Sequence, residues 1–324
     1  MKVRVAVIGC GGIAGAHMER LARIKDVEFV GMCDVDEKKA AGAAGKYAGK
    51  VFTDYRRMLD QVKTDCCYIC VPPFAHVGQE LLCVEKNIPF FVEKPIELDL
   101  KKAKAIARKV QEKRLITGVG YVLRYFDVVE KARKILAQEE IGMLRGRYYG
   151  GVPGDGKGWY SQKKLSAGQL VEQATHTVDM MRNFAGDVTE VFGYAFEGIN
   201  KKIYEKYDVE DASTTVMKFK NGLIGNMSCT WLATGYQSNV EVVGKGVTVF
   251  YEGTTLTVDR HTEKTIYTTS MDCMLAEDQA FIEDVKKGRP NKIKSDYLDG
   301  LKTLAVSLAA LESFRTGKPV KLDV

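Results

Sequence analysis

Short apolar runs alternate with amphipathic segments through the first third of the chain. Six runs of strand length lie at residues 3–8, 27–33, 51–53, 65–71, 90–93 and 115–120. The segments between them carry apolar residues at the spacing of a helix that packs one face on a sheet. Strands and helices in strict alternation form parallel sheets with helical crossovers. We therefore predict a doubly wound parallel α/β sheet over residues 1–121.

The pattern changes after Gly120. Strand-like runs lie at residues 144–151, 188–199, 214–220, 223–231, 239–243 and 247–251, and helices are predicted over 127–139, 272–287 and 295–316. Asn221 and Gly222, between two of these runs, are a strong signal for a tight hairpin. Runs joined by tight turns indicate an antiparallel sheet. We therefore predict a second, α+β domain over residues 122–324, with a mainly antiparallel sheet.

The glycine-rich segment Gly9–Ala14, with the sequence GCGGIA, follows the first predicted strand and opens a helix. Strand, glycine turn and helix in this order are typical of a dinucleotide-binding Rossmann fold. Gly9 is expected to make the tight turn, and Gly11 to let the backbone approach a pyrophosphate at the helix N-terminus. Gly12 and Ile13, the next two residues, complete the predicted cofactor contacts of this turn.

Asp34 directly follows the second predicted strand. A carboxylate at this place accepts hydrogen bonds from the adenosine ribose and repels a 2′-phosphate, so we predict NAD as the cofactor in preference to NADP. Lys38 and Lys39 lie close enough to weaken that discrimination. The alternative is that Asp34 caps the helix that starts near Asp36.

Two further strand ends carry polar residues. Glu93 and Lys94 follow an apolar run and precede Pro95. The carboxyl edge of a parallel sheet is where open α/β folds bind ligands, although a surface ion pair is the simpler alternative. His76 lies in the first turn of a helix predicted over residues 74–86, where it either contacts the cofactor or packs in a loop.

A helix predicted over residues 169–185 carries the candidate chemistry of the second domain. One side holds the apolar residues Leu170, Ala174, Val178, Met181 and Ala185, and the other holds Glu172, His176, Asp179 and Asn183. A carboxylate one turn before a histidine can orient the imidazole for general base catalysis. The alternative is a solvated polar face. Upstream, the glycine-dense loop Gly150–Tyr160, which ends in the aromatic residues Trp159 and Tyr160, is either a lid or sugar-stacking wall or a long surface connection.

Composition narrows the possible function classes. The 324 residues carry 48 Lys and Arg against 42 Asp and Glu, a net charge of +6 spread along the chain with no basic stripe, so we expect no nucleic-acid partner. No segment has the length of a membrane span, and the first residues are typical of a strand and not of a signal peptide. Six of the eight cysteines lie in the first third, within or next to predicted strands and helices. We expect reduced, buried thiols in a cytoplasmic protein, without a metal or redox site at Cys67 and Cys70.

In combination these motifs resemble the Gfo/Idh/MocA family of NAD(P)-dependent oxidoreductases over nearly the whole chain. The resemblance rests on Ile8–Ala14, Val71-Pro72-Pro73 with His76, Glu93-Lys94-Pro95, Gly120–Tyr125, Val209-Glu210-Asp211 and Phe219–Gly222. It implies hydride transfer between NAD and a hydroxyl-bearing carbon of a sugar or polyol. Glu172 stands where the family commonly has an aspartate.

The resemblance also implies roles for individual residues. Lys94 and His176 are the expected catalytic residues, with Glu172 beside them. The expected cofactor contacts beyond the glycine turn and Asp34 are Val71, Pro72, His76, Glu93 and Lys94. The expected substrate contacts are Tyr121, Arg124, Trp159, Glu172, His176 and Asp179. We further expect a homo-oligomer, a dimer or tetramer, formed through the second sheet. Two alternatives stay open: a redox-neutral hydrolase or epimerase that uses bound NAD transiently, and a non-catalytic NAD-binding sensor.

Overall fold

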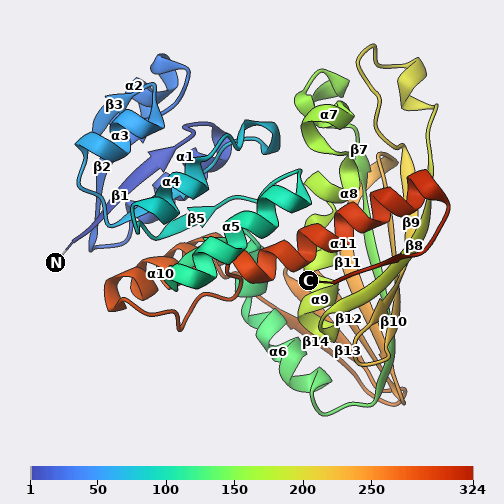
Figure 1. The fold of residues 1–324 in the computed structure, drawn as a ribbon. Helices are drawn as coiled ribbons and strands as arrows, with labels where there is room; N and C mark the ends of the chain where they lie inside the picture. Colours follow the sequence, from blue (N-terminus) through green and yellow to red (C-terminus); the bar gives the residue numbers. More distant parts are fainter. Residues whose placement is uncertain (1, 324) are drawn as a thin grey trace. The chain divides into compact units, whose positions relative to one another are not determined.

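Two units make up the chain in the computed structural model, which describes residues 2–323 (Figure 1). Unit 1 contains Met1–Val122 and Asp272–Leu301, and unit 2 contains Leu123–Met271 and Lys302–Val324. The predicted division into residues 1–121 and 122–324 left out the return of Asp272–Leu301 to unit 1. The sequence gives no signal for this return, because an amphipathic pattern does not specify which sheet a helix packs on.

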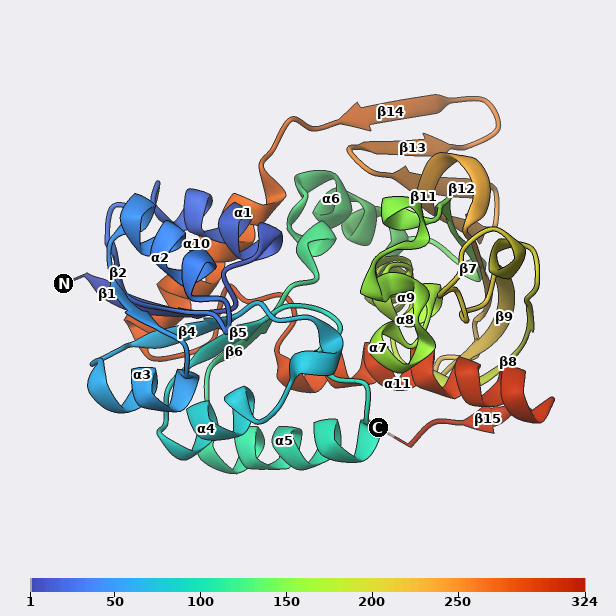
Figure 2. The same cartoon turned by 90° about the horizontal axis from the view of Figure 1, so that it is seen from above.

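Unit 1 is built on a six-stranded sheet of order β3-β2-β1-β4-β5-β6, in which all pairs are parallel. Its strands are β1 (Val3–Ile8), β2 (Val27–Cys33), β3 (Lys50–Phe52), β4 (Cys66–Ile69), β5 (Phe90–Val92) and β6 (Thr117–Val119). Its helices are α1 (Gly12–Leu21), α2 (Glu37–Tyr47), α3 (Tyr55–Gln61), α4 (Gln79–Glu85), α5 (Leu100–Lys113) and α10 (Cys273–Lys287). α1, α2 and α10 cover one face and α3, α4 and α5 the other (Figure 2). The predicted doubly wound sheet is confirmed.

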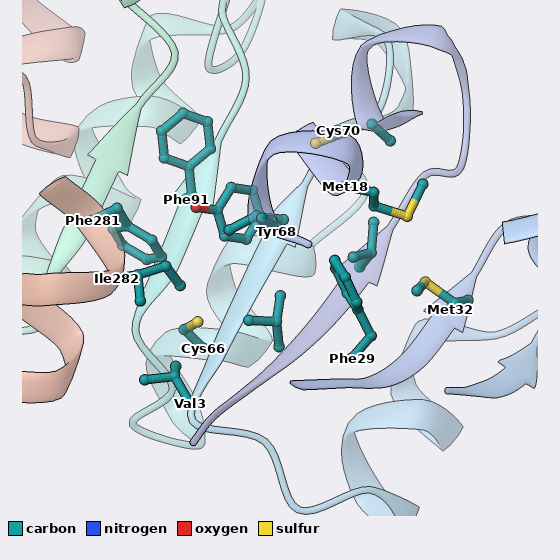
Figure 3. Packing of buried hydrophobic residues seen from close by; sticks show 14 of the residues in the cluster. Val3, Met18, Phe29, Met32, Cys66, Tyr68, Cys70, Phe91, Phe281 and Ile282 are labelled. Carbon is teal, nitrogen blue, oxygen red and sulfur yellow. The ribbon is translucent and has the colours of Figure 1, made fainter. Parts of the chain in front are cut away.

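An aromatic cluster fixes α10 on the sheet (Figure 3). The rings of Tyr68 on β4 and Phe91 on β5 stack with centroids 4.9 Å apart. Phe281 on α10 meets both edge-on, at 5.5 Å from Tyr68 and 5.7 Å from Phe91. All three side chains are at most 1% exposed. Aromatic burial of this kind contributes a large share of the hydrophobic stabilisation, which explains why the segment after residue 271 returns to unit 1.

Unit 2 is built on a nine-stranded sheet of order β14-β13-β12-β11-β7-β10-β9-β8-β15. Its strands are β7 (Ile141–Gly151), β8 (Val188–Phe196), β9 (Ala212–Phe219), β10 (Ile224–Thr230), β11 (Leu232–Gly244), β12 (Val247–Glu252), β13 (Thr255–Asp259), β14 (Lys264–Thr268) and β15 (Val320–Lys321). Neighbouring strands are antiparallel except β7 and β10, which confirms the mainly antiparallel sheet. The hairpin at Asn221 and Gly222 joins β9 to β10, and Gly222 has a φ of +90°. The prediction missed β13, β14 and β15.

Helices lie against one face of this sheet. They are α6 (Asp127–Leu136), α7 (Lys163–Ser166), α8 (Gln169–Glu172), α9 (Thr175–Ala185) and α11 (Tyr297–Thr316), which begins in unit 1. α9 packs on β7 and β11, and α6 packs on β12 and β13 (Figure 2). Along β9, buried side chains alternate with exposed ones. The exposed ones lie on the opposite face of the sheet, where Val216 is 52% exposed.

Two helices predicted as continuous are interrupted. The segment 74–86 forms a short 3₁₀ turn, Pro73–Ala75, and then α4, because Gly78 between them takes a φ of +116°. The segment 169–185 divides into α8 and α9, with Gln173 and Ala174 between them. Periodicity did not reveal either break because the apolar spacing continues across both. Within residues 2–323 no helix is long and apolar enough to cross a membrane.

Candidate functional site

The turn between β1 and α1 has a backbone that favours glycine. Gly9 has a φ of +85°, and a Cβ there would lie 2.4 Å from the carbonyl oxygen of Cys70. A Cβ on Gly11 would meet no atom within 4 Å, so the space beside it is open. Gly11 is the N-cap of α1, and Gly12 and Ile13 follow on its exposed first turn. Since a helix N-terminus presents N–H groups and the positive end of its dipole, the turn fits the pyrophosphate of NAD.

Asp34 joins the end of β2 to the glycine turn. Its carboxylate accepts hydrogen bonds from the backbone N–H of Cys10 at 2.8 Å and of Asp36 at 2.9 Å. The N-cap of α2 is Asp36, which accepts from the backbone N–H of Lys38 at 3.0 Å. The capping role that was the alternative for Asp34 therefore belongs to Asp36. A carboxylate has about four acceptor sites, so Asp34 retains capacity for ribose hydroxyls.

Glu93 and Lys94 follow β5 directly, at the carboxyl edge of the sheet. Glu93 is only 6% exposed, so the alternative of a surface ion pair is wrong for its carboxylate. Glu93 Oε2 accepts a hydrogen bond from the backbone N–H of Lys94 at 3.0 Å. Lys94 is half-buried, and its peptide bond to Pro95 is cis. The catalytic role of Lys94 stays a prediction.

The Glu93 carboxylate also binds His17 of α1, a residue that the sequence did not single out. His17 Nε2 lies 3.0 Å from Glu93 Oε1, and His17 Nδ1 lies 2.7 Å from Asp278 Oδ1 on α10. Burial alone lowers the pKa of His17, but Asp278 and Glu93 outweigh it and raise that pKa to about 10. Burial likewise raises the pKa of Asp278, against the opposing effect of His17. The feature of the sequence that could have pointed to His17 is its position on the apolar side of α1.

Val71, Pro72 and His76 follow β4, the neighbour of β1. Val71 lies beside the glycine turn, since its Cγ1 would be 3.1 Å from a Cβ on Gly9. His76 is buried, and its Nδ1 pairs with Glu80. His76 Nε2 has no hydrogen-bond partner among the residues that the structure describes. The packed loop expected as the alternative is therefore found, and contact of these three residues with the cofactor stays a prediction.

Glu172 and His176 belong to different helical segments of unit 2. Glu172 ends α8 and is 4% exposed, and His176 lies in the first turn of α9. The alternative of a solvated polar face is wrong for Glu172, and equally for Asp179, which is 1% exposed. The break at Gln173 removes the regular one-turn spacing between Glu172 and His176. The catalytic pairing of these two residues stays a prediction.

Aromatic side chains gather near Glu172. Tyr148 of β7 donates a hydrogen bond from its hydroxyl to Gln173 Oε1 at 2.9 Å, and Trp159 and Tyr160 have ring centroids 4.1 Å apart. Burial raises the pKa of both Tyr148 and Tyr160, and the charge of Glu172 adds to each shift. A carboxylate beside aromatic faces suits a polyhydroxylated ring. Sequence reasoning missed Tyr148 and Gln173, for which no motif gave a signal.

Arg124 and Asp179, both predicted to contact substrate, bind each other. Arg124 Nε and Nη2 donate to the two carboxylate oxygens of Asp179 at 2.8 and 2.6 Å. The Thr303 hydroxyl donates to Asp179 Oδ1 at 3.0 Å and accepts from Arg182 Nη1 at 2.7 Å. Arg124 is 6% exposed and Asp179 1%. The pair therefore joins the segment before α6 to α9 and α11, a role that was not predicted.

Tyr121, another predicted substrate contact, is 1% exposed and follows β6 in unit 1. All eight cysteines are free thiols, and burial raises the pKa of Cys67 and Cys70 well above the usual value. Buried, protonated thiols are poor nucleophiles and poor metal ligands. Among residues 2–323, no group of three or more His, Cys, Asp or Glu side chains is placed to hold a metal ion.

Comparison with known proteins agrees with this geometry. The relatives include scyllo-inositol 2-dehydrogenase (NAD(+)) of Bacillus subtilis, 28% identical over 100% of this chain and 97% of its own length. Myo-inositol 2-dehydrogenase of Thermotoga maritima is 25% identical over 99% of both chains. Among solved structures, levoglucosan dehydrogenase in complex with NADH and L-sorbose has a TM-score of 0.90 at 20% identity and covers 100% of both chains. That likeness supports the fold.

Two family models cover most of the chain. Residues 3–121 match the oxidoreductase family with an NAD-binding Rossmann fold, and residues 129–249 match the GFO/IDH/MocA C-terminal domain. The two matches follow each other in the order in which the family has these domains, and the first contains the glycine turn, Asp34 and Lys94. The chain belongs to the GFO/IDH/MocA family of oxidoreductases.

Proposed function

We propose that the protein transfers a hydride between NAD and a hydroxyl-bearing carbon of a sugar, polyol or sugar derivative. The observation that carries the proposal is the glycine turn of unit 1, open beside Gly11 and tied to Asp34, at the same edge of the parallel sheet as Lys94, which follows β5. In open α/β sheets ligands bind where the strand order reverses, here between β1 and β4. When bound, NAD supplies the hydride acceptor or donor.

The residues of this chain manage the proton. His176 takes the proton of the substrate hydroxyl, and Lys94 donates a hydrogen bond to the same oxygen, which stabilises the developing alkoxide. Glu172 either orients His176 or binds a substrate hydroxyl. Trp159 supplies an aromatic wall for the ring. Because Arg124 and Asp179 satisfy each other, they support α9 and do not contact substrate directly in this proposal.

The buried carboxylate of Glu172 favours a neutral polyhydroxylated substrate over an anionic one, since like charges repel at close range. The two inositol dehydrogenases named above act on such compounds, which supports this class. Purified protein with NAD should form NADH with at least one compound from a panel of inositols, hexoses and anhydrosugars. Sugar phosphates and uronic acids serve as the matched anionic controls. A preference for these anionic compounds would contradict the substrate class.

Replacing Asp34 with serine should shift cofactor preference toward NADP. The change removes the charge that repels a 2′-phosphate and the acceptor for the ribose hydroxyls. We expect kcat/KM for NAD to fall about tenfold or more, because a charged hydrogen bond contributes about 1.5–3 kcal/mol. The control is Asp36→Ser, which removes the same charge two residues away and keeps a good N-cap. Equal ratios of NAD to NADP activity in both variants would refute the role of Asp34.

We also propose that two copies associate through the open face of the unit 2 sheet. This face holds an apolar groove of about 300 Å³ whose lining includes Met143, Phe192, Val216 and Ile224. Arg145 and Glu241 on the same sheet form an ion pair with each other at 3.2 Å. Sedimentation should show a dimer or tetramer, and Val216→Lys should dissociate it. A monomeric wild type would refute the proposal.

The eight free thiols support a cytoplasmic location.

A further inference from the structure

His17 is held between two carboxylates inside unit 1. Its imidazole is 1% exposed and contacts Glu93 through Nε2 at 3.0 Å and Asp278 through Nδ1 at 2.7 Å. A neutral imidazole carries one N–H and can donate only one of these bonds, whereas the imidazolium donates both. The ring also lies edge-on to Phe91 at 5.0 Å, which limits its rotation.

Glu93 transmits this contact to Lys94. Its Oε1 faces His17, and its Oε2 accepts the backbone N–H of Lys94 at 3.0 Å. On the remaining side, a Cβ on Gly120 would lie 2.7 Å from both Glu93 Cδ and Oε1. The carboxylate is therefore fixed by the imidazole, by the Lys94 amide and by the close backbone of residue 120. Loss of any of these three contacts would let the Glu93 carboxylate move, and the backbone at the start of the Lys94 side chain would move with it.

We propose that His17 is a positioning residue for Lys94: its imidazole holds the Glu93 carboxylate, which in turn fixes the backbone N–H of Lys94. The kinetic part of this inference rests on the proposed function, in which Lys94 acts on the substrate. The buried imidazolium has two N–H groups to satisfy, and Asp278 accepts the one on Nδ1 while Glu93 accepts the one on Nε2. The second contact places α1, the helix after the glycine turn, in direct contact with the residue before Lys94. The same helix that binds the pyrophosphate thus sets the position of the catalytic lysine.

Amide hydrogen exchange tests the positioning without any activity. In His17→Gln the hydrogen bond from the Lys94 amide should loosen, so that this amide exchanges at least tenfold faster, while the Phe91 amide within β5 keeps its rate. Gly120→Ala displaces Glu93 without touching the charge of His17 and should give the same result. The control is His261→Gln, since His261 is exposed in unit 2. If either His17→Gln or Gly120→Ala folds and the exchange rate of its Lys94 amide is unchanged, the proposal is overturned.

Kinetic coupling provides the second arm. His17→Gln should lower kcat about tenfold with the KM for NAD nearly unchanged, and it should cost much less when Lys94 is already alanine. Equal, additive costs in both backgrounds would overturn the proposal, since His17 would then act independently of Lys94. If the wild type shows no dehydrogenase activity, the proposed function fails, and the exchange result alone decides the positioning.

The titration of His17 gives a readout in stability. The titratable groups that face this cluster are Glu93, Asp278, Tyr68 and Cys70. Because the pKa of His17 is raised from 6.5 to about 10, its stabilisation is fully present below pH 6.5 and is lost as the pH rises toward 10. The unfolding free energy of the wild type should fall across this range, and His17→Gln should show a flatter dependence. Urea unfolding at several pH values measures this dependence. If the unfolding free energy falls equally with pH in the wild type and in His17→Gln, the charged imidazole of His17 does not link Glu93 to Asp278.

Discussion

Replacing Lys94 with alanine will lower the turnover number about a hundredfold to a thousandfold. A donor aimed at an oxygen that gains negative charge in the transition state contributes about 2.7–4 kcal/mol, and alanine removes it. Because this interaction strengthens only as the charge develops, kcat should fall while the KM for NAD changes little. Steady-state kinetics with a substrate from the polyol panel measures both constants.

The matched control is Lys101→Ala, which removes an exposed lysine at the start of α5 in the same unit. It should leave both constants unchanged. His176→Ala should lower kcat near neutral pH as well, so the two variants together separate the roles of donor and base. An unchanged kcat in Lys94→Ala would remove the central residue from the proposed mechanism.

Asp179→Ala will lower the unfolding free energy by about 3–5 kcal/mol. The change leaves the buried guanidinium of Arg124 without the two carboxylate oxygens that it binds at 2.8 and 2.6 Å. Removing one partner of a buried ion pair leaves an uncompensated charge in the interior, and this cost exceeds the net value of the pair itself. Urea unfolding monitored by circular dichroism measures the change, with the midpoint and slope fitted separately.

Arg315→Ala is the control for this effect. Arg315 forms an ion pair with Glu312 at 2.6 Å, but its side chain is 71% exposed, so its loss should leave stability nearly unchanged. If Asp179→Ala keeps the unfolding free energy of the wild type but has a raised KM for substrate, the original expectation that Asp179 contacts substrate is supported instead. That result would contradict the supporting role inferred from the structure.

The first sheet could be predicted from sequence because its information is local. Each strand of unit 1 is a short apolar run beside a helical pattern, and the glycine turn lies directly between the first strand and the helix after it. The bounds of β2 match the expected residues 27–33. In unit 2 the five-residue strands β13 and β14 were missed, and for β14 the alternating polar residues of Lys264–Thr268 give a weak strand signal.

The contacts within the candidate site could not be predicted, because they join residues far apart in sequence. His17 and Asp278 are separated by 261 positions, and neither belongs to a recognised motif. Arg124 was expected to contact substrate because it belongs to a segment, Gly120–Tyr125, that resembles the family. The structure shows that its anion is Asp179, 55 positions later. Charge complementarity over such separations depends on the fold, and a residue pattern alone does not specify it.

The most direct test of the central claim follows deuterium from substrate to cofactor. The protein is incubated with NAD and a polyol deuterated at the reacting carbon, and the cofactor is examined by mass spectrometry. Direct hydride transfer predicts NADH that carries one deuterium, formed in proportion to oxidised product. Product formation without any net labelled NADH would contradict the dehydrogenase and favour the redox-neutral cycle, while binding of NAD without product would favour the sensor.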